Sequence, residues 1–109
     1  MKGITLKLFG LKTCDTCRAA RKALPEAEFI DVRERGVDPE ILSKALGRFG
    51  DDLVNRRSTT WRALTESERA RPDLDLLVDY PTLMKRPLIV DDARMVLGWS
   101  KSSQTELGV

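Results

Sequence analysis

The only two cysteines of the chain, Cys14 and Cys17, stand two residues apart in the stretch GLKTCDTCRAARKAL, residues 10–24. A thiol pair at this spacing can form and break a disulfide, or it can coordinate a metal ion. It can also be two small apolar residues that are buried without any chemistry. Each possibility implies a different class of protein, so the surrounding residues must decide among them.

The residues that follow Cys14 favour thiolate chemistry. Residues 15–24 are rich in Ala, Arg, Lys and Leu and lack Gly and Pro, which predicts a helix that begins at Asp15 and ends near Pro25. Cys14 then precedes the first turn, where unpaired N–H groups and the helix dipole stabilise negative charge. Such a position lowers the pKa of a thiol from about 8.5 to between about 3.5 and 7.5. We therefore expect Cys14 to be a nucleophile, and Cys17, one turn later, to be its resolving partner.

Local charge points the same way. Lys12 and three cations of the predicted helix surround the cysteines with positive charge, and only Asp15 opposes them. The net charge of the whole chain is only +2, so it gives no reason to expect direct contact with nucleic acid. Two more basic groups, in NRRSTTWR and in KRP, could by themselves be ordinary solvated surface.

A metal site is less well supported by the residue types. Structural zinc normally takes four Cys or His ligands, whereas this chain has two cysteines and no histidine. Only a dimer that shared the ion could complete a site of four sulfurs, and we expect no bound metal or other cofactor. The lack of histidine also removes a Cys-His hydrolase. A redox pair and two unreactive buried cysteines remain as interpretations of the spacing.

Length and composition indicate one globular domain, residues 1–109. The chain has 41% apolar and 33% charged residues, which excludes a disordered or membrane-embedded class. Lys7 interrupts the first apolar run too early for a signal peptide or a membrane span. The expected location is the cytoplasm, without membrane contact. Structural disulfides are rare in that compartment, which again favours redox chemistry for the pair.

The first part of the chain has the pattern of a βαβ unit. Ile4, Leu6 and Leu8 alternate with polar residues and predict a strand over residues 4–9. After the helix that carries the cysteines, the run EFIDV predicts a second strand over residues 28–32. Two strands joined by one helix are typical of a parallel pair.

A block of helices follows, and a hairpin ends the chain. Asp38 is the expected cap of a helix that begins at Pro39, the motif TESE from Thr65 predicts a capping box, and Asp73 is expected to cap another short helix. Residues 51–60 have no regular pattern. Residues 88–90 and 95–97 predict a hairpin joined at Asp91, Asp92 and Ala93, and a last helix is predicted from Ser100. Without the block of helices, the element order is β-α-β, β-β-α, which is that of a thioredoxin-like fold. The sequence therefore predicts an α/β protein with a mixed central sheet. The block is then a helical insertion at about 38–80.

Four fragments together resemble one family. The runs LFGLKTCDTCRAARKAL, LVNRRSTTWRAL, YPTLMKRPLIV and VLGWS are similar, in order and spacing, to those of the arsenate reductase (ArsC)/Spx family and especially of its YffB-like branch. The resemblance implies a thioredoxin fold with a helical insertion. It also implies that Pro87 is a cis-proline beside the active-site cysteine and that Cys14 is the nucleophile.

The resemblance further implies a set of substrate-binding residues. Arg86 corresponds to the oxyanion-binding arginine that precedes the family's proline, and Arg56 or Arg57 corresponds to the arginine that follows the helical insertion. A planar guanidinium suits both oxyanions and carboxylates. With Pro87 and Lys12, these arginines are the expected substrate-binding set.

Two departures from the arsenate reductase pattern bear on the reaction. A further arginine of those enzymes is replaced by Leu97 or Gly98 in VLGWS, and Cys17 provides an internal resolving thiol that their mechanism does not use. The YffB-like branch implies a glutathione-dependent thiol reductase, with glutathione or another thiol as co-substrate. An Spx-like redox-switch regulator that binds the RNA polymerase α subunit is the alternative, and arsenate reduction is another.

Overall fold

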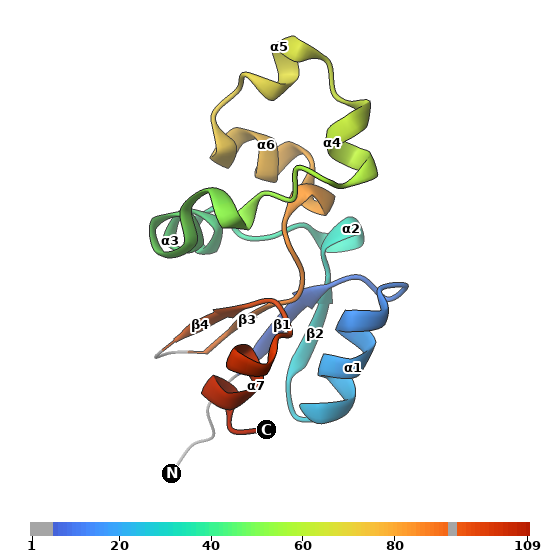
Figure 1. Cartoon of the computed structure of the whole chain (residues 1–109), viewed down its shortest axis with the longest axis vertical. Coiled ribbons are helices and arrows are strands. Elements are labelled where there is room, and N and C mark those ends of the chain that lie inside the picture. The colour runs from blue at the N-terminus through green and yellow to red at the C-terminus, as the bar shows by residue number, and fades with distance from the viewer. Residues whose placement is uncertain (1–5, 92–93) are drawn as a thin grey trace. The chain divides into compact units, whose positions relative to one another are not determined.

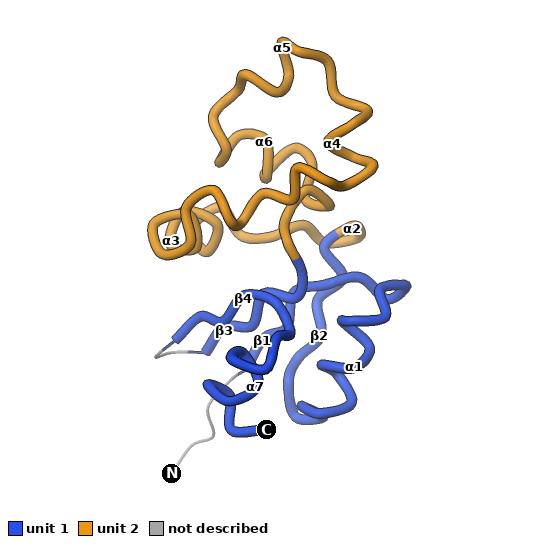
Figure 2. Tube along the Cα trace, viewed as in Figure 1, with its two compact units in different colours: residues 1–32, 86–109 blue, residues 33–85 orange. Residues whose placement is uncertain are grey.

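The computed structural model describes residues 6–91 and 94–109. In it the chain divides into two compact units, shown in different colours in Figure 2: residues 1–32 with 86–109, and residues 33–85. The second unit contains the range in which the sequence predicts the helical insertion. The first contains both cysteines.

The first unit is built on a four-stranded sheet in the order β2-β1-β3-β4. The strands are β1 (Lys7–Gly10), β2 (Glu28–Asp31), β3 (Leu88–Val90) and β4 (Met95–Leu97). β1 pairs in parallel with β2 and antiparallel with β3, and β3 pairs antiparallel with β4. The sheet is therefore mixed, and the βαβ unit and the hairpin predicted from the sequence are both confirmed. Ile4, Asp92 and Ala93, which the predictions placed in the first strand and in the hairpin turn, lie outside the described residues.

Two helices, α1 (Asp15–Ala23) and α7 (Lys101–Leu107), belong to this unit (Figure 1). The apolar core of the unit is formed by buried Leu8, Ala20, Leu24, Ile89 and Val96. Trp99 and Leu107 pack against the same cluster, so α1 and α7 cover one face of the sheet. Burial of each such large aliphatic side chain contributes about 1.5–3 kcal/mol. This core fixes α1, and with it both cysteines, on the sheet.

The second unit is helical. Its elements are α2 (Val32–Arg35, which begins at the last residue of the first unit), α3 (Pro39–Phe49), η1 (Gly50–Leu53), α4 (Thr59–Ala63), α5 (Glu66–Arg69), α6 (Asp73–Asp79) and η2 (Pro81–Leu83). α3 packs on α6, and the interior consists of side chains such as Leu42, Leu53, Leu76 and Leu83. A single antiparallel bridge between Val54 and Met84 joins the two ends of the segment 55–83.

Most predicted helix ends are confirmed. The Asp38 side chain accepts a hydrogen bond of 2.9 Å from the Glu40 N–H, and Thr65 forms the full capping box with Glu68. Ser100 caps the last helix. These side chains satisfy backbone N–H groups that have no partner inside the helix.

Three local predictions are corrected. The cap of α6 is Pro72, with φ −56° and ψ 145°, and not Asp73. Asp73 is the first helical residue, where its carboxylate interacts favourably with the positive end of the helix dipole. β2 ends at Asp31 because buried Val32 already starts α2. Residues 51–60, predicted as irregular, include most of η1 and the start of α4, because Ser58 caps that helix with a bond from the Trp61 N–H.

The element order and the mixed sheet are those of a thioredoxin-like fold with a helical insertion between β2 and β3. Among the described residues, no helix combines the length and apolar character that crossing a bilayer requires.

Candidate active site

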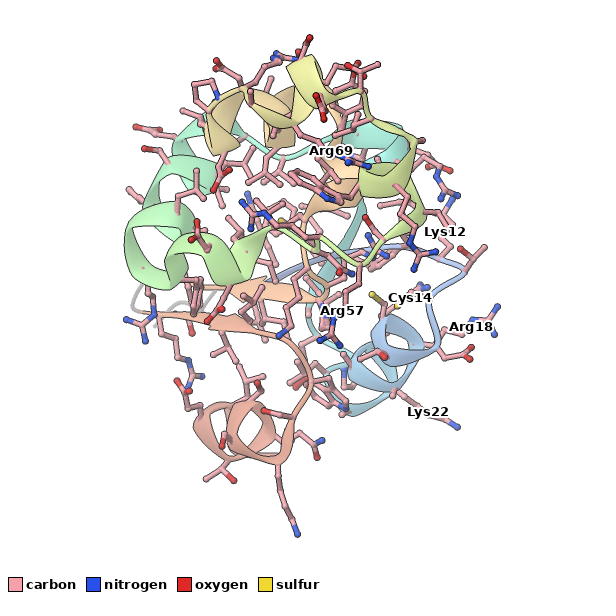
Figure 3. The ribbon with its side chains drawn as sticks, turned by 45° about the horizontal axis from the view of Figure 1, so that its top comes forward. Lys12, Cys14, Arg18, Lys22, Arg57 and Arg69 are labelled. Atoms are coloured by element: carbon pink, nitrogen blue, oxygen red, sulfur yellow. The ribbon has the colours of Figure 1, made fainter. Side chains whose placement is uncertain are left out.

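Cys14 is the residue directly before the first turn of α1 (Figure 3). Its backbone is extended, with φ −88° and ψ 122°, and its carbonyl accepts the first helical hydrogen bond, of 2.9 Å, from Arg18. Its own N–H donates to the Leu11 carbonyl at 3.2 Å, which closes a tight turn after β1. Cys14 is a free thiol and is partly exposed. The chain therefore presents this sulfur at the N-terminal end of α1, as the sequence predicts.

The electrostatic surroundings of Cys14 favour the thiolate. Burial raises the pKa of the thiol, but hydrogen bonds from the backbone and the thiol of Cys17 and from the backbone of Thr16 lower it. The positive charge of Arg86 lowers it further, and the resulting pKa is below the ordinary cysteine value. The backbone amides can stabilise the Cys14 thiolate because, at the start of a helix, they have no carbonyl partner within the helix.

Cys17 has the opposite character. It is completely buried, and burial raises its pKa to about 11, an effect that the hydrogen bond and the charge of Cys14 reinforce. A backbone hydrogen bond at Leu11 and the charge of Arg86 oppose this shift. Of the two thiols, the partly exposed Cys14 is therefore the one that ionises more readily, and Cys17 beneath it is protonated at neutral pH.

Gly10 makes room for the buried thiol. A Cβ atom at this position would lie 2.5 Å from Cys17 Sγ and 3.1 Å from Cys17 Cβ. Contacts between real Cβ atoms and other atoms are essentially never shorter than 3.0 Å. The last residue of β1 must therefore lack a side chain if α1 is to place Cys17 against the strand.

Asp31 is a site residue that the sequence analysis missed. It is a buried carboxylate at the end of β2, where it stands beside Gly10 in the parallel register. Its Oδ2 atom accepts a hydrogen bond of 3.1 Å from the Lys12 N–H and so holds the loop that leads to Cys14. The signal available in the sequence was a carboxylate directly after the apolar pair Phe29 and Ile30, at the carboxyl end of a strand, where ligand sites of α/β proteins form.

The loop is held from a second side by α1. Arg18 Nε donates to the Lys12 carbonyl at 3.2 Å, so both backbone groups of Lys12 are bonded. The Lys12 side chain itself is exposed. Lys12 thus lies two residues from Cys14 in a loop of fixed backbone.

Arg86 and Pro87 belong to the same unit as the cysteines. The peptide bond between them is cis, as the sequence analysis expected, and Pro87 is fully buried. The Pro87 carbonyl accepts a hydrogen bond of 2.8 Å from Gly98, the residue after β4. The φ of Gly98 is +83°, a conformation that other residues rarely adopt. This backbone gives a physical reason for glycine in VLGWS.

Arg56 and Arg57 lie in the second unit and differ in their contacts. The Arg56 guanidinium donates to the Asp51 carbonyl and to Asp73 Oδ1, both at 3.4 Å. It also lies over the Trp61 ring, 5.2 Å from its centroid. Arg56 is therefore occupied in holding its own unit together, in part through the Trp61 ring.

Arg57 forms hydrogen bonds through its backbone. Its N–H donates to Asn55 Oδ1 at 3.1 Å, and its carbonyl accepts from Arg62 at 2.8 Å. Within the described part of the chain its guanidinium has no hydrogen bond or ion pair. With Lys85, Arg56 and the carboxylates of Asp51 and Asp52 it lines a cavity of about 640 Å³ in the second unit. Of the two candidate arginines, Arg57 is the one whose side chain is available to a ligand.

Comparison with known proteins gives concordant results. The sequence model of the ArsC family matches residues 9–107. An uncharacterized protein of Haemophilus influenzae is 39% identical over 105 residues, 88% of this chain and 92% of its own length. The global transcriptional regulator Spx of Bacillus subtilis is 30% identical over 105 residues, 86% of this chain and 79% of its own length.

The similarity extends to solved structures. A YffB protein superimposes with a TM-score of 0.83 at 31% identity, covering 94% of this chain and 97% of its own. The resemblance inferred from the four sequence fragments is confirmed.

Substitution of Gly10 tests the packing of the buried thiol. Gly10→Ala should lower the free energy of unfolding by about 1–3 kcal/mol, because the new methyl group overpacks the space of Cys17 Sγ. In a Cys17→Ala background the same change should cost much less, which urea titration of the four proteins of the cycle can measure. If Gly10→Ala lowers the free energy of unfolding equally in wild type and in Cys17→Ala, the new methyl group does not press on Cys17 Sγ.

Alkylation as a function of pH tests the electrostatics. The thiolate is the reactive form, so a lowered pKa means that iodoacetamide modifies Cys14 at full rate from a lower pH than a free thiol of pKa about 8.5. Mass spectrometry should show Cys17 unmodified at neutral pH, because its pKa is about 11. Arg86→Gln should move the Cys14 profile to higher pH.

The matched control is Lys101→Gln, which removes one positive charge from an exposed position of α7 in the same unit. It should leave the profile in place. A Cys14 profile that coincides with that of a free thiol, or that Arg86→Gln does not shift, contradicts the assignment of the electrostatic causes.

Proposed function

Since the chain belongs to the ArsC family, we propose that it is a thiol-disulfide oxidoreductase that uses Cys14 as nucleophile, Cys17 as resolving thiol and glutathione as reductant. The observation that carries the proposal is the asymmetry of the pair. One thiol has a lowered pKa and is partly exposed, whereas the other is buried and has a raised pKa. An attacking thiol needs exposure and a lowered pKa, and a resolving thiol needs to stand beside it, within reach of the mixed disulfide.

In the first step the Cys14 thiolate attacks one sulfur of a substrate disulfide. A mixed disulfide forms between Cys14 and that sulfur, and the other sulfur leaves as a thiolate that takes a proton. The N–H groups of Thr16 and Cys17 hold the attacking sulfur beforehand, so no reorganisation is required.

The second step depends on a change in Cys17. Once Cys14 is in a mixed disulfide, its negative charge is gone. The hydrogen bond and repulsion that raise the pKa of Cys17 are lost with it, although the effect of burial remains. Cys17 then loses its proton more readily and attacks Cys14. The second substrate thiol leaves, and a Cys14–Cys17 disulfide remains.

Glutathione restores the dithiol. One glutathione thiolate attacks the accessible Cys14 sulfur and releases Cys17. A second glutathione then attacks the sulfur of the bound glutathione, which yields oxidised glutathione and reduced Cys14. The two electrons taken from two glutathione molecules equal those delivered to the substrate disulfide.

Positive charge supports the choice of glutathione, which carries two carboxylates. Arg86 acts on the thiolate itself, and Lys12 stands two residues away. We propose Arg57 as the guanidinium of the second unit that binds a carboxylate, because Arg56 is committed to Asp73 and Trp61. Paired N–H donors of a guanidinium match a carboxylate in geometry.

Arsenate reduction is a less favoured activity. The position of the further oxyanion-binding arginine falls at Leu97 or Gly98, and the left-handed backbone of Gly98 disfavours any side chain there. An internal resolving thiol also makes the external thiol of that mechanism unnecessary after the first attack.

A redox-switch regulator is the second candidate function, favoured by the 30% identity with Spx over 86% of this chain. In that case the same disulfide would form, but its product would be altered binding to the RNA polymerase α subunit. Retention of this subunit on the immobilised chain, with no disulfide turnover by glutathione, would favour the regulator over the enzyme.

The enzyme proposal is tested by trapping the mixed disulfide. Incubation of Cys17→Ser with oxidised glutathione should accumulate an adduct of one glutathione on Cys14, seen by intact mass. Wild type should resolve it and form the internal disulfide. Cys14→Ser is the control and should form neither product. If Cys17→Ser forms no adduct, the glutathione mechanism is wrong.

The two arginines of the second unit are distinguished by separate measurements. Arg57→Gln should raise KM for glutathione about tenfold, the loss of one charge-assisted contact, while urea unfolding is unchanged. Arg56→Gln should lower the free energy of unfolding, because Arg56 holds Asp73, the Asp51 carbonyl and Trp61 within the unit. The reverse pattern would assign the ligand to Arg56.

A further inference from the structure

A groove with a cationic border lies in the first unit, along the last turns of α1 and beside β2. It has a volume of about 460 Å³. Arg18, Arg21 and Lys22 of α1 line one side, and Leu24, Pro25 and Phe29 contribute apolar surface. We infer that this groove, named here the α1–β2 groove, binds an extended acidic segment of a partner protein.

The charge of the groove is not neutralised by its own lining, which contains no carboxylate. Within the described part of the chain, neither Lys22 nor Arg21 forms an ion pair, and the Arg21 guanidinium lies over the Phe29 ring, with Cζ 4.1 Å from the centroid. Arg18 approaches Asp15 at 3.8 Å, but both side chains are largely exposed, so that pair is weak. Figure 3 shows Arg18 and Lys22 extending outward from α1. Arg18 also donates to the Lys12 carbonyl, so Arg21 and Lys22 are the cations available to an anionic ligand.

The apolar part of the groove makes the ligand a peptide rather than a bare anion. Phe29 is partly buried against the core of the unit, and the Arg21 guanidinium covers its ring. Leu24 and Pro25 continue this surface from the end of α1 into the following turn. A ligand that fills the groove must combine negative charge with apolar groups.

The open edge of β2 supplies main-chain partners for such a segment. In the described sheet β2 is an outer strand. The Glu28 N–H donates to the Leu6 carbonyl at 2.7 Å, so the backbone of Glu28 faces β1. Because the direction alternates along a strand, the N–H and C=O of Phe29 face away from β1, toward the open edge. An extended chain can pair with this edge as an added strand.

The two features fit one occupant. A residue paired beside Phe29 projects its side chain to the same face as Phe29, which is the face that α1 covers. Acidic residues at alternate positions of the added strand would therefore reach Arg21 and Lys22. Main-chain bonds would give affinity for extended chains, and the cations would select acidic ones.

The α1–β2 groove is separate from the thiol site. α1 has nine residues, a length of about 13 Å, with Cys14 at its beginning and Arg21 and Lys22 in its last turn. A bound segment can leave Cys14 uncovered. The inference therefore does not depend on the redox function, and Cys14→Ser should bind the segment as wild type does.

The test uses a fluorescein-labelled, blocked peptide of alternating glutamate and valine, titrated with the full chain and followed by anisotropy. The double variant Arg21→Gln/Lys22→Gln should weaken binding about tenfold or more, the loss of two charged contacts. The matched control Lys44→Gln/Arg48→Gln removes the same charge from exposed positions of α3 and should bind as wild type does. A peptide with lysine in place of glutamate should not bind.

Hydrogen exchange adds a readout of the strand pairing. The Phe29 amide should exchange more slowly when the acidic peptide is bound, while the Val96 amide of β4, the other outer strand, should not change. Peptide binding without protection of Phe29, or with equal loss in both double variants, overturns the inference. It is also overturned if oligothymidylate or phosphatidylserine vesicles bind with the same affinity and the same sensitivity to Arg21→Gln/Lys22→Gln, because the groove would then be a general anion surface.

Discussion

The hydrogen bonds that the first amides of α1 direct at the Cys14 sulfur are the interaction on which the site depends. Amides at the beginning of a helix have no carbonyl partner within it, so a nearby thiolate satisfies them at little cost. Cys14 is buried enough for burial alone to raise its pKa, and the lowered pKa results only because Thr16, Cys17 and Arg86 outweigh burial. The pKa of Cys14 therefore depends on the position of α1. The apolar contacts of Ala20 and Leu24 with the sheet fix that position.

The buried thiol imposes a second constraint, which explains the residues at the ends of the strands. Cys17 fits under α1 because Gly10 has no side chain, and Gly10 is the last residue of β1. Beside it in the register, Asp31 fastens the loop through the Lys12 N–H. Gly98 accepts a left-handed backbone and bonds the Pro87 carbonyl. Each of these residues stands at a strand end or just beyond it, where the side chain or its absence shapes the loop next to the sulfur.

Cationic side chains have different roles according to what already occupies them. Arg18 is tied to the Lys12 carbonyl and Arg56 to Asp73 and Trp61, so both stabilise local structure. Arg86 acts on the thiol pair, whereas Arg57 and Lys22 have no charged partner in the part of the chain that the structure describes. A basic residue in the sequence therefore does not indicate a binding site until its contacts are known. The proposals for Arg57 and for the α1–β2 groove rest on those contacts.

The sequence by itself determined the fold class, because the period-two runs, the caps at Asp38, Thr65 and Ser100 and the turn residues act over a few neighbouring positions. It also identified the cysteine pair and placed Cys14 directly before a helix, since the start of that helix is a local property. The part played by Asp31, the clash that excludes a side chain at Gly10 and the difference between Arg56 and Arg57 were decided only by the tertiary structure. Each depends on partners from separate elements: β2 with the loop after β1, α1 with β1, and α6 with the segment after η1. Neighbouring residues alone cannot specify such contacts, because packing brings the partners together.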